Sequence, residues 1–349
     1  MCDAFIRVAF LMQVGNSNPF KITSLWVVII YGVKYMKIVF LDMYNSNPGD
    51  IDVSRFEELG EFITYDRTEK SDIKERIKDA DIVITNKVKL GKSELEGTKV
   101  KFIAEAATGF DNIDLNAIKE LGIGLANVPS YSTYSVVQLT LAHLLNATND
   151  VYSYAKKVRE GEWVDSQDFN FFLGTIHELA GKTAGIVGYG DIGQKVADAY
   201  RALGMKVIAL KVEGHHASGD FFKGYEDFFK EADIVSLHAP MNADSKEIIN
   251  KESLALMKRT AIIINTARGG LINEDDLADA LKNGEVAFYA SDVAAPEPMT
   301  KDNKLYALEN AAFTPHIAWA SLEARQRLYD VMYNNIKAFI DGRSENRIV

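Results

Sequence analysis

The sequence predicts an α/β protein with two domains, each a parallel β-sheet flanked by helices. Short apolar runs alternate with helical patterns from residue 36 to near the C-terminus, which is the pattern of βαβ units. A glycine-rich run at 188–193 lies where an apolar strand pattern gives way to a helical one. The chain also has 349 residues, more than a single core usually holds. We therefore expect two sheets with a cleft between them.

The first domain is predicted to begin at Met36, where residues 36–42 form an apolar run typical of an opening strand. Its strands are expected at 37–41, 82–85, 102–104 and 124–126, and its helices at 54–59, 72–77 and 115–121. This alternation implies that the strands run parallel and that helices cover the sheet.

Residues 1–35 are expected to form an extension outside this fold. Their apolar run at 25–31 is far shorter than the roughly 20 residues that span a bilayer. Asp3, with only Arg7 nearby, makes a poor charged segment for a signal peptide. The sequence therefore predicts neither export nor a membrane anchor, and no membrane is expected as a partner.

The glycine-rich run indicates a nucleotide-binding βαβ unit, with strands expected at 183–187 before it and 206–210 after it. Between them, apolar residues recur at the spacing of one buried helix face: Ile192, Val196, Ala199 and Leu203. The first glycine permits a tight turn, the second lets the backbone approach a pyrophosphate, and the third lets helix and strand pack closely. Main-chain N–H groups and the positive end of the helix would face the phosphates. We interpret this half as a Rossmann-like domain.

A long helix is expected between the two sheets. It should follow residues 129–133, with Ser132 or Thr133 as its N-cap, and run towards Lys157. The remaining strands of the second sheet are expected at 234–237, 261–264, 287–291 and 312–313. The last helix, 321–340, carries apolar residues at core spacing and is expected to pack on the first domain.

These elements divide the chain into three parts. Residues 1–35 lie outside the fold, residues 36–133 plus 317–349 form a discontinuous substrate domain, and residues 134–316 form the dinucleotide-binding domain. In open α/β sheets, ligands bind beyond the carboxyl ends of the strands, so the residues that follow each strand are the first candidates for a functional site.

Composition argues against several classes of partner. Lys and Arg number 39 and Asp and Glu number 49, a formal net charge of −10, and no long basic stripe is present, so nucleic acid is not expected. Cys2 is the only cysteine, which excludes an intramolecular disulfide and fits a reducing cytoplasm. Of six histidines only His215 and His216 are close together, without the spacing that completes a metal site, so no metal is expected.

Candidate catalytic side chains follow the expected strands of the second sheet. Arg268 follows the run 261–264, and a guanidinium donates two parallel hydrogen bonds to a planar carboxylate. Glu297 and His316 come after the last two strands, and a carboxylate beside an imidazole makes a general acid that works near neutral pH. Taken singly, each residue has a plainer interpretation: an arginine paired with a structural carboxylate, a solvated loop glutamate, and a turn histidine bonded to backbone. Their joint position at strand ends favours a catalytic site.

From Met36 to the C-terminus the sequence resembles the D-2-hydroxyacid dehydrogenases. The likeness rests on the order and spacing of several segments: 107–114, 127–133, 178–183, 188–193, 265–270 and 314–316. Residues 316–321 and 323–327 are similar to the branch of hydroxypyruvate reductases and glycerate dehydrogenases. The resemblance implies an NAD(P)-dependent oxidoreductase that moves a hydride between nicotinamide C4 and C2 of a small 2-oxo or D-2-hydroxy acid.

The resemblance also implies a role for each site residue. His316 would give its proton to the developing alkoxide, Glu297 would hold the imidazole charged and oriented, and Arg268 would grip the substrate carboxylate and carbonyl. The implied substrate contacts are Ala107, Thr108, Gly109 and Arg268. The implied cofactor contacts are Gly188, Gly190, Asp191, Ile192, Gly193, Lys211, Ala239, Pro240, Ser245, Thr266, Ala267 and Asp292.

Lys211 departs from the pattern of NAD-binding domains. About 20 residues after the glycine run, such domains carry an acidic residue that binds the ribose 2′-hydroxyl, and this chain has Lys211 there instead. Lys211 could meet the 2′-phosphate of NADP, whereas Glu213 could supply the missing acceptor. We expect NAD as the cofactor, with NADP left open by Lys211.

Several alternatives remain open from the sequence. Hydroxypyruvate, glycerate and glyoxylate are favoured as substrates, with bulkier 2-oxo acids open; formate is disfavoured because its oxidation moves no proton and Glu297 belongs to a proton-transferring site. A homodimer is expected from the family, in which the helix near 134–157 contributes to the interface, although its apolar residues could equally form an intramolecular core. The alternative function is a catalytically idle NAD(H)-sensing binding protein, which the absence of a recruitment segment or basic arm disfavours.

Overall fold

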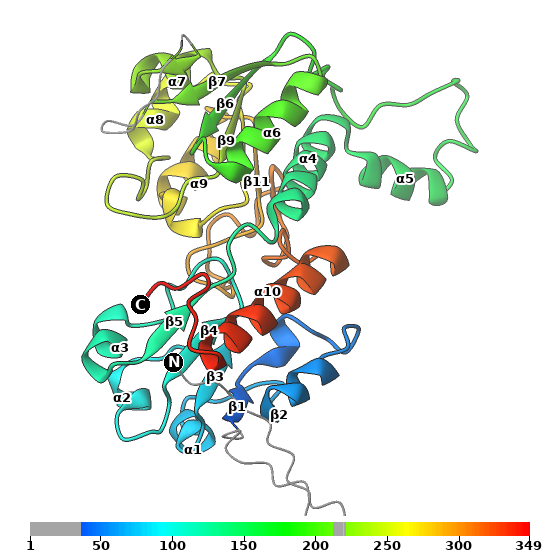
Figure 1. Cartoon of the computed structure of the whole chain (residues 1–349). Coiled ribbons are helices and arrows are strands. Elements are labelled where there is room, and N and C mark those ends of the chain that lie inside the picture. The colour runs from blue at the N-terminus through cyan, green and yellow to red at the C-terminus, as the bar shows by residue number, and fades with distance from the viewer. Residues whose placement is uncertain (1–35, 212–218, 220) are drawn as a thin grey trace, which may run out of the picture.

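A computed structural model describes residues 36–211, 219 and 221–349, which form two α/β domains (Figure 1). The expected extension 1–35 and the residues Glu213, His215 and His216 lie outside the described residues. Each domain contains one sheet in which all paired strands are parallel, so the predicted fold class is confirmed. No helix in the described ranges is long and apolar enough to cross a membrane.

The first sheet has five strands in the order β2-β1-β3-β4-β5. They are β1 (Met36–Phe40), β2 (Gly60–Thr64), β3 (Ile82–Thr85), β4 (Phe102–Glu105) and β5 (Gly124–Ala126). Every residue of β3, β4 and β5 is buried, as expected for a parallel sheet covered on both faces. The sequence did not predict β2, because this edge strand buries only Gly60 and therefore lacks a continuous apolar run.

Helices cover both faces of the first sheet. One face packs against α1 (Ile73–Ile77), α2 (Lys92–Leu95) and α3 (Leu115–Leu121). The other packs against α10 (Leu322–Ile340), whose Leu328, Met332 and Ile336 are fully buried with residues of β1, β3 and β4. The last helix therefore returns to the first domain, as predicted. Two 3₁₀ turns, η1 (Met43–Asn45) and η2 (Ser54–Glu58), complete this domain, and η2 replaces the helix expected at 54–59.

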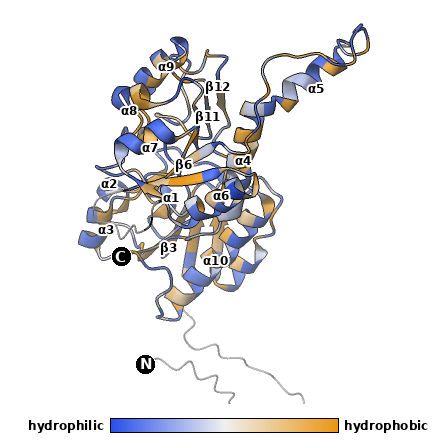
Figure 2. Cartoon of the chain, turned by 90° about the horizontal axis from the view of Figure 1, so that it is seen from above, coloured by the Kyte–Doolittle hydropathy of each residue, from blue (hydrophilic) through white to orange (hydrophobic). Residues whose placement is uncertain are grey.

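The second sheet has seven strands in the order β12-β11-β10-β9-β6-β7-β8. They are β6 (Thr183–Val187), β7 (Lys206–Leu210), β8 (Phe222–Lys223), β9 (Ile234–Leu237), β10 (Ile262–Asn265), β11 (Phe288–Ser291) and β12 (Ala311–Phe313). Its helices are α6 (Asp191–Ala202), α7 (Tyr225–Glu231), α8 (Lys251–Leu256), α9 (Glu274–Lys282) and the 3₁₀ turn η3 (Gly269–Leu271). The chain reverses its direction of sheet growth between β6 and β9, which makes a switch point beside the glycine run. Figure 2 shows apolar residues along β6 and polar residues on the outer surfaces of the helices.

The long helix expected to run to residue 157 is instead two helices, α4 (Thr133–Asn149) and α5 (Val151–Arg159). Asp150 separates them with a left-handed backbone conformation (φ 45°), which ends a right-handed helix. Ser132 occupies the N-cap position as expected, and its side chain makes no capping hydrogen bond. α5 has no buried residue, and Figure 1 shows it and the following segment extending away from the two domains.

The buried face of α6 differs from the predicted one by about one residue. Val196 is buried as expected, but Ala197 and Tyr200 are fully buried whereas Ala199 is only partly buried. The Tyr200 hydroxyl donates a hydrogen bond to Ser236 Oγ (3.2 Å), which satisfies the polar end of a buried ring. A search for aliphatic residues alone could not detect this position.

Candidate active site

The glycine run forms the turn between β6 and α6, at the switch point of the second sheet. Gly188 has a positive φ of 90°, and a Cβ built on it would lie 2.5 Å from the main-chain nitrogen of Ala239, so only glycine fits there. A Cβ on Gly190 would meet nothing within 4 Å, which leaves open space above the second glycine. Gly190 is also the N-cap of α6 and has no side chain to occupy the first helix amides. The turn therefore fits a dinucleotide pyrophosphate.

Other expected cofactor contacts lie at the carboxyl ends of neighbouring strands. Ala239 and Pro240 follow β9, and Ser245 closes their loop by donating a hydrogen bond to the Pro240 carbonyl (2.6 Å). Thr266 and Ala267 follow β10, the next strand in the sheet. These residues line the same edge of the sheet as the glycine turn, as their sequence positions predict.

Two further expected cofactor residues have partners of their own. The Asp191 carboxylate accepts a hydrogen bond from the Ser130 hydroxyl (2.8 Å), which links α6 to the segment before α4. Lys211 follows β7, donates its main-chain N–H to the Lys223 carbonyl (2.8 Å), and has an exposed side chain. Ile192 is partly buried against the core under β6. Their contacts with a cofactor stay predictions.

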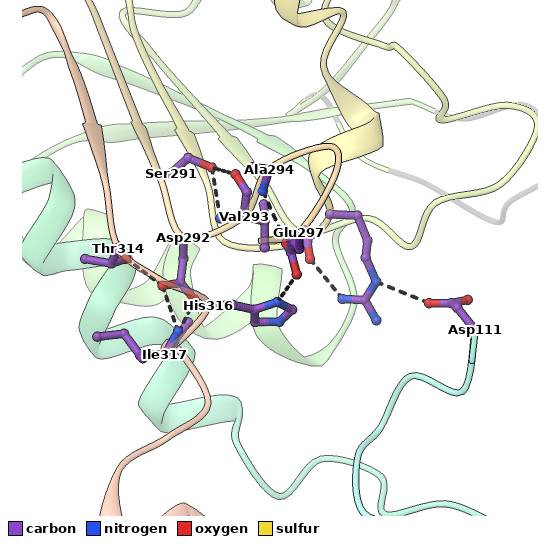
Figure 3. Close-up of polar contacts among 12 residues, drawn as sticks. Asp111, Ser291, Asp292, Val293, Ala294, Glu297, Thr314, His316 and Ile317 are labelled. Atoms are coloured by element: carbon purple, nitrogen blue, oxygen red, sulfur yellow. Dashed lines mark hydrogen bonds and ion pairs between the residues drawn. The ribbon is translucent and has the colours of Figure 1, made fainter. Parts of the chain in front are cut away.

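His316 and Glu297 form a hydrogen-bonded pair (Figure 3). The distance from His316 Nδ1 to Glu297 Oε2 is 2.6 Å. The imidazole is 26% exposed and the carboxylate 37%, so the pair is sheltered but accessible to a small molecule. Because Nδ1 faces the carboxylate, Nε2 is the nitrogen that can exchange a proton with a substrate.

The charge state of Glu297 suits this pairing. Burial raises the pKa of the Glu297 carboxyl, but the hydrogen bond and charge of His316, the N–H of Ala294 and the charge of Lys87 together hold that pKa below its ordinary value. The Ala294 N–H lies 3.2 Å from Glu297 Oε1. An ionised Glu297 can only accept a hydrogen bond, so it orients the imidazole with Nδ1–H towards the carboxylate.

Asp292 fixes the loop that carries His316. Its side chain is buried, and its carboxylate accepts hydrogen bonds from the N–H groups of Ile317 (2.9 Å) and Ala318 (2.7 Å) and from the Thr314 hydroxyl (2.5 Å) (Figure 3). His316 itself has a φ of 56°, a left-handed conformation that is uncommon for non-glycine residues. The carboxylate therefore positions this loop, and a direct contact of Asp292 with the cofactor stays a prediction.

Arg268 reaches from the second domain to the first. Its Nε lies 3.4 Å from Asp111 Oδ2, and its Nη1 donates to the Ala267 carbonyl (2.9 Å). Asn265 holds the turn behind it, donating to the Arg268 carbonyl (2.9 Å) and accepting from the Ala267 N–H (3.0 Å). A Cβ on Gly109 would lie 2.3 Å from Arg268 Nη2, so the two segments are in direct contact. The guanidinium is thereby turned towards the expected substrate segment.

In the segment 107–109, the first two carbonyl groups are engaged and the amides are available. The Ala107 carbonyl accepts from the Val128 N–H (2.9 Å), and the Thr108 carbonyl accepts from Asn127 Nδ2 (2.7 Å). Within the part of the chain that the structure describes, the N–H groups of Ala107, Thr108 and Gly109 donate no hydrogen bond. Unpaired amides next to Arg268 suit a carboxylate ligand.

Polar groups of the first domain also border this site, and they were not among the predicted site residues. Lys87 follows β3, and it lines a cavity of about 650 Å³ together with Asp111, the partner of Arg268. Its charge also acts on Glu297, as described above. Lys87 follows β3 and Asp111 follows β4, so both lie beyond the carboxyl ends of strands in the first sheet, where ligands bind in open α/β sheets. Among the described residues, no group of three or more histidine, cysteine or acidic side chains could hold a metal ion.

A glycine turn that fits a pyrophosphate, in one sheet with strands that lead to a histidine–carboxylate pair, is the arrangement expected of a nicotinamide-dependent dehydrogenase. Comparison with known proteins agrees, since residues 141–318 match the family model of the "D-isomer specific 2-hydroxyacid dehydrogenase, NAD binding domain". The chain belongs to this family of dehydrogenases, which act on a CH–OH group with NAD(P). The expected family is thus confirmed.

Similar proteins cover almost the whole described chain. It is 42% identical over 318 residues to a hydroxypyruvate reductase of Blautia hydrogenotrophica, covering 89% of this chain and 99% of that protein. It is 38% identical over 314 residues to a glycerate dehydrogenase of Methylorubrum extorquens, covering 89% and 98%. A solved acyclic imino acid reductase in complex with NADPH and D-Arg is 30% identical, with a TM-score of 0.78, covering 90% of this chain and 100% of that one.

Proposed function

We propose that this dehydrogenase interconverts hydroxypyruvate and D-glycerate, with glyoxylate as a second substrate. The observation that carries the proposal is the 2.6 Å pair of His316 and Glu297 in a chain whose similar proteins include a hydroxypyruvate reductase and a glycerate dehydrogenase. A pair that exchanges a proton is what the reduction of a ketone needs, because the product alkoxide must be protonated.

The proposed reaction gives each residue one task. A bound nicotinamide supplies the hydride that forms the new C–H bond at C2. His316 Nε2 gives its proton to the former carbonyl oxygen, and Glu297 stabilises the imidazolium before that transfer. Arg268 and the free amides of the segment 107–109 hold the substrate carboxylate, which fixes the face of C2 that meets the cofactor.

We propose that the first domain, 36–133 plus 317–349, binds the substrate and that the second, 134–316, binds the dinucleotide. The return of α10 to the first sheet supports the discontinuous substrate domain, and the glycine cradle supports the second assignment. Closure of the two domains around a ligand would exclude water from the path of the hydride.

The substrate is tested by following NADH absorbance with equal concentrations of hydroxypyruvate, glyoxylate, pyruvate and a bulkier 2-oxo acid. The proposal predicts the highest kcat/KM with hydroxypyruvate and measurable turnover of glyoxylate. A preference of tenfold or more for the bulkier acid would contradict it. Protein that binds NADH but oxidises it with none of these acids would support the idle sensor, although neither curated relative described above bears a sensor's name.

We propose NAD as the cofactor, with Lys211 as the residue that decides how well NADP is used. Lys211 is exposed at the end of β7, where the acidic residue of an NAD-binding domain would lie. Changing Lys211→Asp should lower kcat/KM for NADPH and leave that for NADH equal or higher. A wild-type enzyme that prefers NADPH tenfold or more would contradict the assignment of NAD.

We also propose a homodimer in which α5 and the segment after it contact a second copy of the chain. Large apolar side chains on this projecting region are exposed in the single chain: Val151, Tyr152, Trp163, Val164, Phe169 and Phe172. Sedimentation at several concentrations should give a dimer for the parent and a monomer for Tyr152→Asp, whereas a monomeric parent would contradict the proposal. A reducing cytoplasm remains the proposed location, on the single cysteine of the sequence.

A further inference from the structure

Helix α4 contacts the loop of His316 through a buried histidine. His143 is 7% exposed, and its Nε2 lies 3.1 Å from Thr314 Oγ1. Thr314 is two residues before His316, and its hydroxyl donates to the Asp292 carboxylate at 2.5 Å. Asp292 in turn accepts from the two amides that follow His316. A continuous series of hydrogen bonds therefore runs from α4, through the Thr314 side chain before His316, to the backbone amides that follow it.

The donor and the acceptor of each hydrogen bond in this series can be assigned. A threonine hydroxyl has one proton, and that of Thr314 is directed to Asp292, which as a carboxylate can only accept. The Thr314 oxygen must then accept from His143, so His143 carries a proton on Nε2. Burial lowers the pKa of His143 against the opposing effect of the Asp292 charge, which favours the neutral ring with this one tautomer.

A second contact from the same face of α4 reaches the loop of Arg268. Thr140 lies one turn before His143, and its Oγ1 is 2.9 Å from Thr266 Oγ1. Thr140 donates its own proton to the Val136 carbonyl (2.8 Å), so the Thr266 hydroxyl is the donor to Thr140. The two α4 side chains thus support the segments that carry Arg268 and His316.

We propose that His143 is a positioning residue for His316, acting through Thr314 and Asp292. The left-handed backbone of His316 needs external support, and the Asp292 carboxylate supplies it to the following amides. His143 fixes the hydroxyl of Thr314 so that its proton is directed to that carboxylate. Loss of the imidazole frees Thr314 to rotate, and small displacements of a catalytic group lower kcat steeply. This inference rests on the proposed role of His316.

The test compares kcat and KM for hydroxypyruvate in the His143→Leu and His143→Gln variants of the full chain. Removing the donor should lower kcat about tenfold with little change in KM, because positioning acts on the chemical step. Glutamine places an amide donor near the same point and should recover most of the loss. Thr148→Val is the matched control, since Thr148 is also buried on α4 but donates only to carbonyls of its own helix.

A double-mutant cycle with Thr314→Val separates positioning from a loss of stability. If His143 and Thr314 act through the same series of hydrogen bonds, His143→Leu should lower kcat little further in the Thr314→Val background. A kcat loss below threefold in His143→Leu, or additive losses in the cycle, would overturn the inference. If His143→Leu does not fold, His143→Phe, which keeps an aromatic ring and removes the donor, takes its place in the cycle. His316→Ala is the reference: if it keeps the parent rate, the proposed function fails, whereas failure of the His143 variants alone removes only the positioning role.

Discussion

At the scale of residues, the central contact is the hydrogen bond between His316 and Glu297. The carboxylate keeps its charge because its hydrogen bonds and two nearby cationic groups outweigh the effect of burial on its pKa. A charged partner does more than orient the ring, because it also places a negative charge beside the imidazole that gives up the proton.

Changing Glu297→Gln keeps an acceptor beside Nδ1 and removes the charge. We expect kcat for the reduction to fall about tenfold or more, because the carboxylate charge no longer faces the imidazole that gives up the proton. Steady-state rates with hydroxypyruvate measure the loss. A kcat within twofold of the parent would show that the carboxylate acts only through orientation.

Glu105 provides a test of stability away from the chemistry. It is fully buried at the end of β4, and burial raises its pKa well above the ordinary 4.5, only partly offset by the hydrogen bond from Asn112. A carboxyl whose pKa is raised on folding contributes stability below its unfolded pKa and loses that contribution as pH rises. Glu105→Gln should therefore raise the free energy of unfolding at neutral pH and change it little below pH 4.5.

Urea unfolding at neutral and acidic pH measures this difference. Glu105 Oε1 has no hydrogen-bond partner among the described residues, so an amide of the same shape leaves no lost contact behind. Glu96→Gln, at an exposed position, is the control and should show no such pH dependence. Destabilisation of Glu105→Gln at neutral pH would contradict the account.

At the scale of elements, two glycines of the turn between β6 and α6 have different tasks. Gly188 is needed for folding, and Gly190 is expected to leave room for the cofactor. Gly188→Ala places a methyl group against the backbone of Ala239 at a positive φ, so it should destabilise the protein by about 1–3 kcal/mol. Gly190→Ala meets no protein atom within 4 Å, so the protein should fold normally and bind NADH at least tenfold more weakly, because the methyl occupies the cofactor's space.

Fluorescence titration of NADH and urea unfolding read these two effects separately. Gly174→Ala is the control, because a Cβ there also meets nothing within 4 Å and the residue belongs to the segment after α5 that extends away from the two domains (Figure 1). Normal NADH affinity in Gly190→Ala would refute the placement of the pyrophosphate at this turn.

The elements that the sequence predicted best are strands in which successive residues are buried. The strands β3, β5, β6, β7 and β9 were found with the bounds that the structure gives, because buried parallel strands are uninterrupted apolar runs. β2 and β8 were missed because they are short or half-exposed, and α7, α8 and α9 were not assigned at all. The break at Asp150 was missed because the surrounding residues are compatible with a helix and only the backbone conformation of one residue ends it.

At the scale of the whole molecule, the site is assembled from two domains, and this determined what the sequence could predict. Arg268, Glu297 and His316 each follow a strand of one sheet, so their proximity was predictable from the order of elements. Lys87 and Asp111 come from the other sheet and meet them only because the domains are adjacent. The contact of His143 depends on how α4 packs across the second sheet, which local periodicity does not encode.

The most direct test of the account is the rate of NADH oxidation with hydroxypyruvate in His316→Ala, measured alongside NADH binding. We expect turnover to fall by roughly 10²–10⁴-fold, the usual contribution of a general acid, while the affinity for NADH stays within about twofold of the parent. A variant that retains the parent rate would contradict the assignment of His316 as the proton donor, and with it the function proposed for this site.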